Sequence, residues 1–172
     1  MYSPLLDFAP DDLNPIDQMG PHIFIGGLEA RTRLTKHNIH HVISLFEDSL
    51  SRAERPDGIQ VYETQYTLND DESTVITHLL DPIESYVANC IQRKENVLIH
   101  CRMGISRSAS IILGLMMAHP DWFGINEKFI NLDMALEHAQ SIRPYIDPNP
   151  AFMSQLRDYE DSLIKQLEIN LY

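Results

Sequence analysis

The sequence contains little cysteine, little positive charge and no long apolar run. Two cysteines are too few for a disulfide scaffold, and no basic-then-apolar leader is seen, so we expect an intracellular protein of the cytoplasm or the nucleus. The longest apolar run, residues 111–118, is far shorter than the ~20 residues of a membrane-spanning helix. With 13 Lys and Arg against 25 Asp and Glu, the formal charge of −12 disfavours nucleic acid and anionic membranes as partners.

What the chain does contain is enough for one compact domain, because 44% of its 172 residues are hydrophobic. Residues 1–21 hold four Pro, four Asp and no base, which predicts an extended acidic arm with at most one short helix over residues 11–17. We therefore expect the folded domain to span residues 22–168.

Strand and helix patterns alternate through this domain. β-rich runs predict strands, whereas capping residues and apolar spacings of three and four predict helices. Strands are expected at 22–25, 41–46, 60–64 and 97–99, and helices at 28–36, 74–92, 106–118, 131–141 and from Asn149 onward. This order is typical of an α/β fold with a central, mostly parallel sheet flanked by helices.

Two basic stretches free of acids, residues 30–46 and 96–120, interrupt the acidic chain. Chance clustering on a solvated face would by itself explain such stretches. The second one, however, contains Val97-Leu-Ile-His-Cys-Arg-Met-Gly-Ile-Ser-Arg-Ser108, a strand that leads through a loop into a helix. Loop backbone N–H groups that turn inward, together with the positive end of a helix, form a site for a tetrahedral dianion. The predicted loop residues are Arg102, Met103, Gly104, Ile105 and Ser106.

Reactive side chains surround this predicted anion site. Cys101 lies at its mouth, where a thiol pKa falls from ~8.5 to roughly 3.5–7.5, so we predict a nucleophilic thiolate. Arg107 adds a bidentate guanidinium for two phosphate oxygens. The hydroxyl of Ser108 can hydrogen-bond the sulfur and make it a better leaving group. His100 is predicted to orient the loop backbone rather than to act as a base, because a thiolate needs no proton removed.

An in-line displacement also needs an acid opposite the nucleophile. Asp70 and Asp71 precede the long predicted helix in a polar loop, where the end of a strand could return them to the same rim. One of the two is the predicted general acid, and the polar loop by itself leaves the choice between them open.

The stretch from His100 to Ser108 resembles the signature loop of the cysteine-dependent protein phosphatases, within them the small dual specificity phosphatases. The resemblance implies Cys101 as nucleophile, Arg107 as phosphate ligand and Asp70 as general acid, with no metal and no cofactor. It covers most of residues 22–163 and includes the segments Phe24–Ala30, Leu68–Asp70 and Arg143–Asn149.

The same resemblance bears on the substrate. It implies a phosphorylated protein with phosphotyrosine and phosphoserine or phosphothreonine, and it places Arg143 in the substrate pocket, with a plain salt bridge as the alternative. Lipid-directed relatives carry Lys in the loop, and RNA-directed ones have Asn and Thr where this chain has Ser106 and Ser108. An RNA 5′-phosphatase, a phosphoinositide phosphatase, an inactive phosphoprotein-binding relative and a rhodanese-like sulfur transferase are the alternatives.

Three further features have two interpretations each. Arg31 and Arg33 either lie on an exposed helix face or draw a phosphorylated substrate to the rim. Cys90 is either a packed core thiol or a redox partner of Cys101. The arm of residues 1–21 leaves the protein either monomeric or a homodimer joined through this segment.

Overall fold

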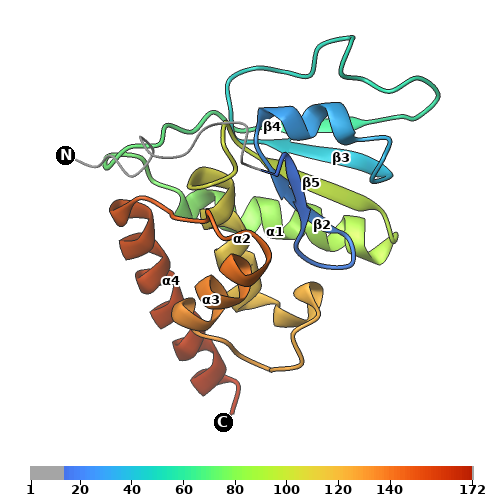
Figure 1. Ribbon diagram of the computed structural model, residues 1–172. Coiled ribbons are helices and arrows are strands. Elements are labelled where there is room, and N and C mark those ends of the chain that lie inside the picture. The colour runs from blue at the N-terminus through green and yellow to red at the C-terminus, as the bar shows by residue number, and fades with distance from the viewer. Residues whose placement is uncertain (1–13, 172) are drawn as a thin grey trace.

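The computed structural model describes residues 14–171, and its centre is a five-stranded sheet (Figure 1). In spatial order the strands are β1 (Ile16–Gln18), β2 (Ile23–Gly26), β5 (Asn96–His100), β3 (Ile39–Ser44) and β4 (Tyr62–Gln65). Neighbouring strands are parallel except β1 and β2, which are antiparallel. The prediction of an α/β fold with a mostly parallel sheet flanked by helices is confirmed.

Strand β1 lies in the segment that the sequence assigned to the arm. It pairs with β2, so that Asp17 lies opposite Ile25, and Met19 beyond it is buried in the core. The sheet therefore begins before residue 22, and residues 16–18 are a strand rather than part of a short helix. Prolines flank this edge strand without interrupting it, which is why they did not mark an arm here. Residues 1–13, with any dimer contact they make, lie outside the described residues.

Side chains on the three inner strands alternate between two cores, as the period of two residues along a strand requires. One face of the sheet adds to the large core and the opposite face to a smaller one. The large core receives Ile25, Ile43 and Ile99, and the smaller core receives Phe24, Val42 and Leu98.

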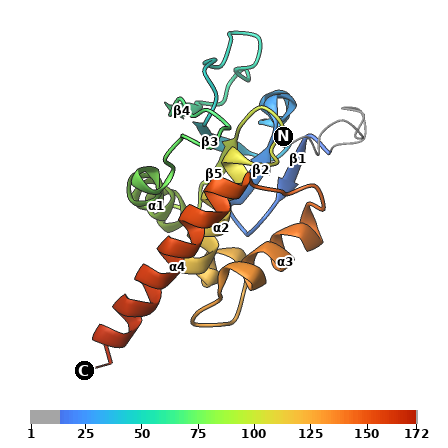
Figure 2. The same cartoon turned by 90° about the vertical axis from the view of Figure 1, so that its left-hand side faces the viewer.

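The four α-helices pack on the large-core side, and the short 3₁₀ helix η3 (Leu28–Arg33) covers the other face (Figure 1). The α-helices are α1 (Thr77–Gln92), α2 (Arg107–Ala118), α3 (Leu132–Ile142) and α4 (Pro150–Ile169), and a 3₁₀ turn, η4 (Pro120–Phe123), follows α2. α2 contacts each of the other three and lies between them (Figure 2), which explains why residues 108–117 are all buried. No helix within residues 14–171 is long and apolar enough to cross a bilayer.

Helix starts follow the predicted capping residues. The side chains of Asn131 and Asn149 accept hydrogen bonds of 2.9 Å from the backbone N–H groups of Met134 and Phe152, so each satisfies a free donor in the first turn of its helix.

The sheet topology determines where a ligand could bind. β5 lies between the parallel strands β2 and β3, with Gly26 and Ser44 both in register with His100. Ligand sites in open α/β sheets form beyond the carboxyl ends of strands where the connections diverge to opposite sides. The segment that follows His100 emerges at this point.

Candidate active site

The loop between β5 and α2 has its carbonyl groups bound to the surrounding scaffold. The Arg102 carbonyl accepts from Leu28 N at 3.0 Å, and the Ile105 carbonyl accepts from Asp147 N at 3.0 Å. The two carbonyls between them, of Met103 and Gly104, accept from the guanidinium of Arg143 at 3.1 and 2.9 Å. In a trans peptide the N–H points opposite to the C=O, so these four bonds direct the N–H groups of residues 103–106 to the other side of the loop.

Gly104 has a backbone conformation that the loop between β5 and α2, here called the cradle, requires. Its φ of +67° lies in the left-handed region, and a Cβ there would come within 2.6 Å of the Gly26 carbonyl carbon and 2.9 Å of an Arg143 nitrogen. Only glycine fits without strain at such a position. The Gly104 N–H donates to Cys101 Sγ at 3.2 Å, so the inward direction of one loop amide is observed directly.

Cys101 is 2% exposed at the base of this cradle. Ser108 Oγ lies 3.2 Å from its sulfur, and α2 begins at Arg107 immediately beyond the loop. A loop amide, a hydroxyl and a helix N-terminus therefore surround one sulfur atom. Each of these groups can stabilise negative charge at that position.

His100 is fully buried beneath the loop. Burial lowers the pKa of its imidazole to about 4, so the ring is neutral at pH 7. Its Nδ1 lies 3.1 Å from the Cys101 carbonyl and therefore carries the proton in this contact. The imidazole thus binds the loop backbone, which is the orienting contact expected of it.

Arg107 makes two contacts with residues outside the loop. One terminal nitrogen donates to the Leu68 carbonyl at 2.9 Å, and the Cζ carbon lies 5.5 Å from the centroid of the Phe46 ring. Its Nε is buried and has no hydrogen-bond partner among residues 14–171. A buried donor without a partner is costly, and a bound phosphate oxygen would satisfy it.

Asp70, which the sequence places 31 residues before Cys101, is tied to the same loop in the structure. Its Oδ1 accepts from Ser106 Oγ at 2.7 Å and from Asn149 Nδ2 at 2.9 Å. Ser106 Oγ in turn accepts from the Asn149 backbone N–H at 3.0 Å. Ser106 was predicted to bind substrate. Its hydroxyl therefore connects the loop that contains Asp70 to the loop between β5 and α2.

The neighbouring Asp71 is turned toward its own loop. Its Oδ1 accepts from the hydroxyl and backbone N–H groups of both Ser73 and Thr74. The hydrogen bonds from Thr74 and Ser73 lower the pKa of this carboxyl below its usual range. The Asp71 side chain is thus engaged by its own loop, whereas the Asp70 side chain contacts Ser106 of the loop between β5 and α2.

Arg143 binds the carbonyl side of the loop. It is 1% exposed, and besides the two loop carbonyls it binds the Asn14 carbonyl at 2.6 Å and Asp17 Oδ2 at 2.7 Å. Of the two positions expected for Arg143, a substrate pocket or a plain salt bridge, the structure shows the salt bridge, which is buried and supports the loop. The side chain of Arg102, in contrast, is exposed at the rim.

Sequence reasoning missed two residues of this arrangement. Asn149 was predicted only as a helix cap, yet it also binds Asp70 and Ser106. Asp17 was assigned to the arm. Both contacts span more than 40 residues of sequence, and no local pattern announces them.

Cys90 lies far from Cys101 in the fold. Its carbonyl accepts from Glu95 N just before β5, whereas Cys101 follows the end of that five-residue strand. At ~3.3 Å per residue, the strand alone separates them by about 16 Å, and a disulfide needs Cα atoms within about 7 Å. Burial raises the pKa of the Cys90 thiol to about 11. Cys90 is therefore a packed core thiol.

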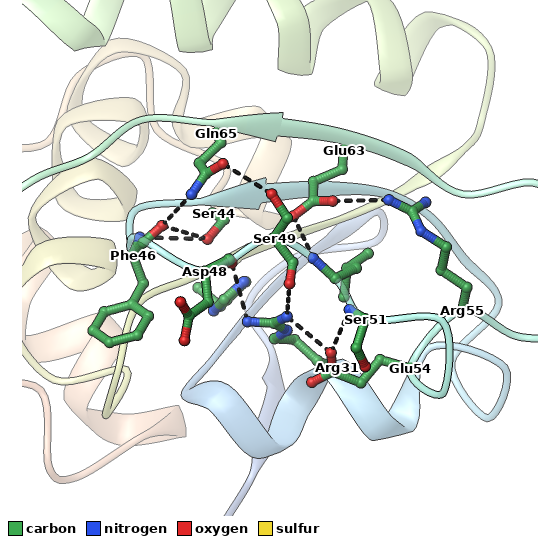
Figure 3. A network of polar contacts seen from close by, with 12 residues as sticks. Arg31, Ser44, Phe46, Asp48, Ser49, Ser51, Glu54, Arg55, Glu63 and Gln65 are labelled. Atoms are coloured by element: carbon green, nitrogen blue, oxygen red, sulfur yellow. Dashed lines mark hydrogen bonds and ion pairs between the residues drawn. The ribbon is translucent and has the colours of Figure 1, made fainter.

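A second buried arginine, Arg31, holds the loop that follows β3. Arg31 reaches from η3 to the loop after β3, where it binds the carbonyls of Asp48 and Ser49 and the carboxylate of Glu54 (Figure 3). It is 4% exposed, so neither an exposed face nor a role in drawing substrate fits it; Arg33 does lie exposed. The loop that Arg31 holds begins at Phe46, whose ring points away from this network (Figure 3) and lies beside Arg107.

Comparisons with known proteins agree on one family. The family model described as "Dual specificity phosphatase, catalytic domain" matches residues 23–162. A Dictyostelium discoideum protein named "Probable dual specificity protein phosphatase" is 29% identical over 161 residues, which are 87% of this chain and 65% of that protein. Mouse protein phosphatase Slingshot homolog 3 is 27% identical over 83% of this chain, which spans only 21% of its length.

Solved structures of the same fold are also similar. The Yvh1 phosphatase domain from Chaetomium thermophilum is 28% identical with a TM-score of 0.70, covering 87% of this chain and 96% of that one. Human DUSP28 superposes with a TM-score of 0.73 at 23% identity, over 87% of this chain and 99% of that one. The second likeness bears on the fold alone.

Proposed function

Because the chain belongs to the dual specificity phosphatase family, we propose that it hydrolyses phosphotyrosine and phosphoserine or phosphothreonine in proteins through a cysteinyl-phosphate intermediate. The observation that carries the proposal is the juxtaposition of Cys101 Sγ with the Gly104 N–H and with Ser108, on a loop to which Asp70 is also bound. The proposed nucleophile, anion cradle and acid are thus linked by hydrogen bonds.

In the first step the Cys101 thiolate attacks the phosphorus atom of the substrate. The S–P bond forms as the P–O ester bond breaks, and the Asp70 carboxyl gives its proton to the departing tyrosine, serine or threonine oxygen. The N–H groups of the loop and Arg107 Nε bind the three nonbridging oxygens, whose charge they stabilise in the transition state.

In the second step a water molecule attacks the phosphocysteine. The new P–O bond forms as the S–P bond breaks, and the Asp70 carboxylate takes the proton of the water. The sulfur leaves as a thiolate, which the Gly104 N–H and the Ser108 hydroxyl stabilise. Phosphate departs, and the enzyme returns to its starting state without a net change.

The choice of a protein substrate rests on the family and on the loop residues. The loop contains no Lys, and Ser106 and Ser108 stand where RNA-directed relatives have Asn and Thr. The formal charge of −12 also opposes the approach of RNA and of anionic lipid. An inactive binding relative is disfavoured because Cys101, Arg107 and Asp70 are all present.

Hydrolysis of an aryl phosphate such as para-nitrophenyl phosphate tests the proposal. We expect turnover that vanadate inhibits and that Cys101→Ser abolishes, because an alcohol in this cradle is not ionised. Asp70→Asn should lower kcat by about 10²–10⁴, and Asp71→Asn, a matched change one residue away, by much less. Turnover by the Cys101→Ser variant would refute the mechanism, and a larger loss with Asp71→Asn would move the acid to that residue.

A further inference from the structure

We propose that Asp17 is a positioning residue for the phosphate loop, which it controls through Arg143 without touching the substrate. This inference rests on the proposed function. Asp17 precedes the region that the family model matches, residues 23–162, so the contact is supplied by a residue outside the matched region.

Arg143 binds two consecutive carbonyl groups of the loop. Its Nε and one terminal nitrogen donate to the carbonyls of Gly104 and Met103. The Met103 carbonyl shares a peptide unit with the Gly104 N–H, which in turn donates to Cys101 Sγ. The Gly104 carbonyl shares a unit with the Ile105 N–H. One guanidinium therefore sets the orientation of two successive peptide planes of the cradle.

The two peptide planes next to Gly104 need a restraint. Gly104 lies at a φ of +67°, and glycine adopts several backbone conformations at similar energy. A rotated peptide would turn a carbonyl oxygen toward the phosphate and take an N–H away from the thiolate. The bonds from Arg143 oppose this rotation.

The buried charge of Arg143 is paired with the carboxylate of Asp17. A guanidinium that is 1% exposed needs a negative partner, and Asp17 provides one at 2.7 Å from a side chain that is 15% exposed. The second oxygen of Asp17 accepts from Asn14 Nδ2 at 2.6 Å. Both carboxylate oxygens are thus in use, and an amide, which has one acceptor oxygen, cannot satisfy both neighbours.

The test compares Asp17→Asn with Asp133→Asn in the full chain. Asp133 pairs with Arg157 on the exposed faces of α3 and α4 and serves as the matched control. For Asp17→Asn we expect about a tenfold loss in kcat/KM and about a tenfold weaker inhibition by vanadate, because misdirected amides bind an oxyanion poorly. Asp133→Asn should change neither, and Asp17→Glu should restore part of both.

A second measurement reads the loop without turnover. The pKa of the Cys101 thiol, followed by absorbance at 240 nm against a Cys101→Ser reference, should rise in Asp17→Asn because the thiolate loses amide stabilisation. A loss of global stability alone would leave this pKa unchanged while the protein is folded. Near-ultraviolet circular dichroism establishes that the variants are compared in the folded state.

Two outcomes would overturn the inference. Removal of a negative charge by itself should strengthen vanadate binding, so a tighter inhibitor constant would show that Asp17 acts only through its charge. An unchanged thiol pKa together with unchanged vanadate inhibition would show that the ion pair serves stability alone. Absence of turnover in the wild-type protein would refute the proposed function, yet the thiol titration would still decide the role of Asp17.

Discussion

Two arginines are buried beside the site in nearly the same way, but they hold different parts of it. Arg143 binds Asp17 and carbonyls of the phosphate loop, which we call the floor, residues 101–106. Arg31 binds Glu54 and carbonyls of the loop after β3, which we call the wall, residues 46–55. Each guanidinium uses one carboxylate and a set of backbone oxygens.

The difference lies in which groups of the site the restrained peptides contact. In the floor, one of the restrained peptides itself carries the Gly104 N–H that donates to Cys101 Sγ. In the wall, they hold a loop whose Phe46 ring lies against Arg107, so the effect on phosphate passes through two side chains. A shift of one ångström should therefore cost far more in the floor than in the wall.

The largest expected effect distinguishes two glycines that both have a positive φ angle. Gly104 in the floor and Gly58, just beyond the wall, have φ values of +67° and +76°, but a Cβ meets Gly26 and Arg143 only at Gly104 and nothing within 4 Å at Gly58. Both Ala variants should lose about 1 kcal/mol of stability from φ. Gly104→Ala should also lose about 10²–10³ in kcat/KM, and Gly58→Ala should lose none. Equal losses in both variants would contradict the distinction.

The next effect concerns His100, which is buried below the floor. Burial lowers its pKa to about 4, and the charges of Arg31 and Arg107 act in the same direction. Between pH 6.5 and 4 the unfolded chain binds a proton that the folded protein excludes, so the stability present above pH 6.5 declines as pH falls. The full difference amounts to about 3 kcal/mol.

Urea unfolding at pH 7 and pH 4.5 measures this decline. His100→Gln has no imidazole to protonate, so its free energy of unfolding should fall by less over the same interval, and the difference between the two proteins isolates His100 from the carboxylates. A decline as steep in the variant as in the wild type would show that His100 does not titrate as its burial requires.

The smallest effect compares the two arginines directly. Lysine keeps the charge but loses the planar fork, so it cannot hold two carbonyls and a carboxylate in the same geometry. Arg143→Lys should lower kcat/KM for an aryl phosphate by about tenfold and Arg31→Lys by less than about threefold, with similar losses in melting temperature. If Arg31→Lys were the more damaging, the wall would control the phosphate more closely than the floor does.

Features of the fold and site could be predicted where their contacts join residues that are close in the sequence. The anion loop and the caps at Asn131 and Asn149 were predicted because their residues are neighbours in the chain. The residues of the polar loop left Asp70 and Asp71 open, and the family resemblance implied Asp70. The contacts of Asp70 in the structure, with Ser106 and Asn149, lie 36 and 79 residues away. An adjacent pair of carboxylates carries no local sign of which one meets the loop.

The two arginines show the opposite limit. An arginine in a sequence is most simply placed at the surface, which is why Arg31 was expected either on an exposed helix face or at the rim. For Arg143 the family resemblance implied a pocket position, with a plain salt bridge as the alternative. Their partners Glu54 and Asp17 lie 23 and 126 residues away. Burial of the charge became possible only where a carboxylate and several carbonyls converged.

The sequence by itself determined that the chain is an α/β protein in which a loop with a cysteine and a glycine joins a strand to a helix, because strand periodicity, a turn glycine and a helix start are local properties. Only the tertiary structure decided which carboxylate faces that loop, that Arg143 supports it from behind, and that a strand before residue 22 completes this support. These contacts depend on where the sheet brings distant segments together, and their energy exists only once water has been excluded from between them.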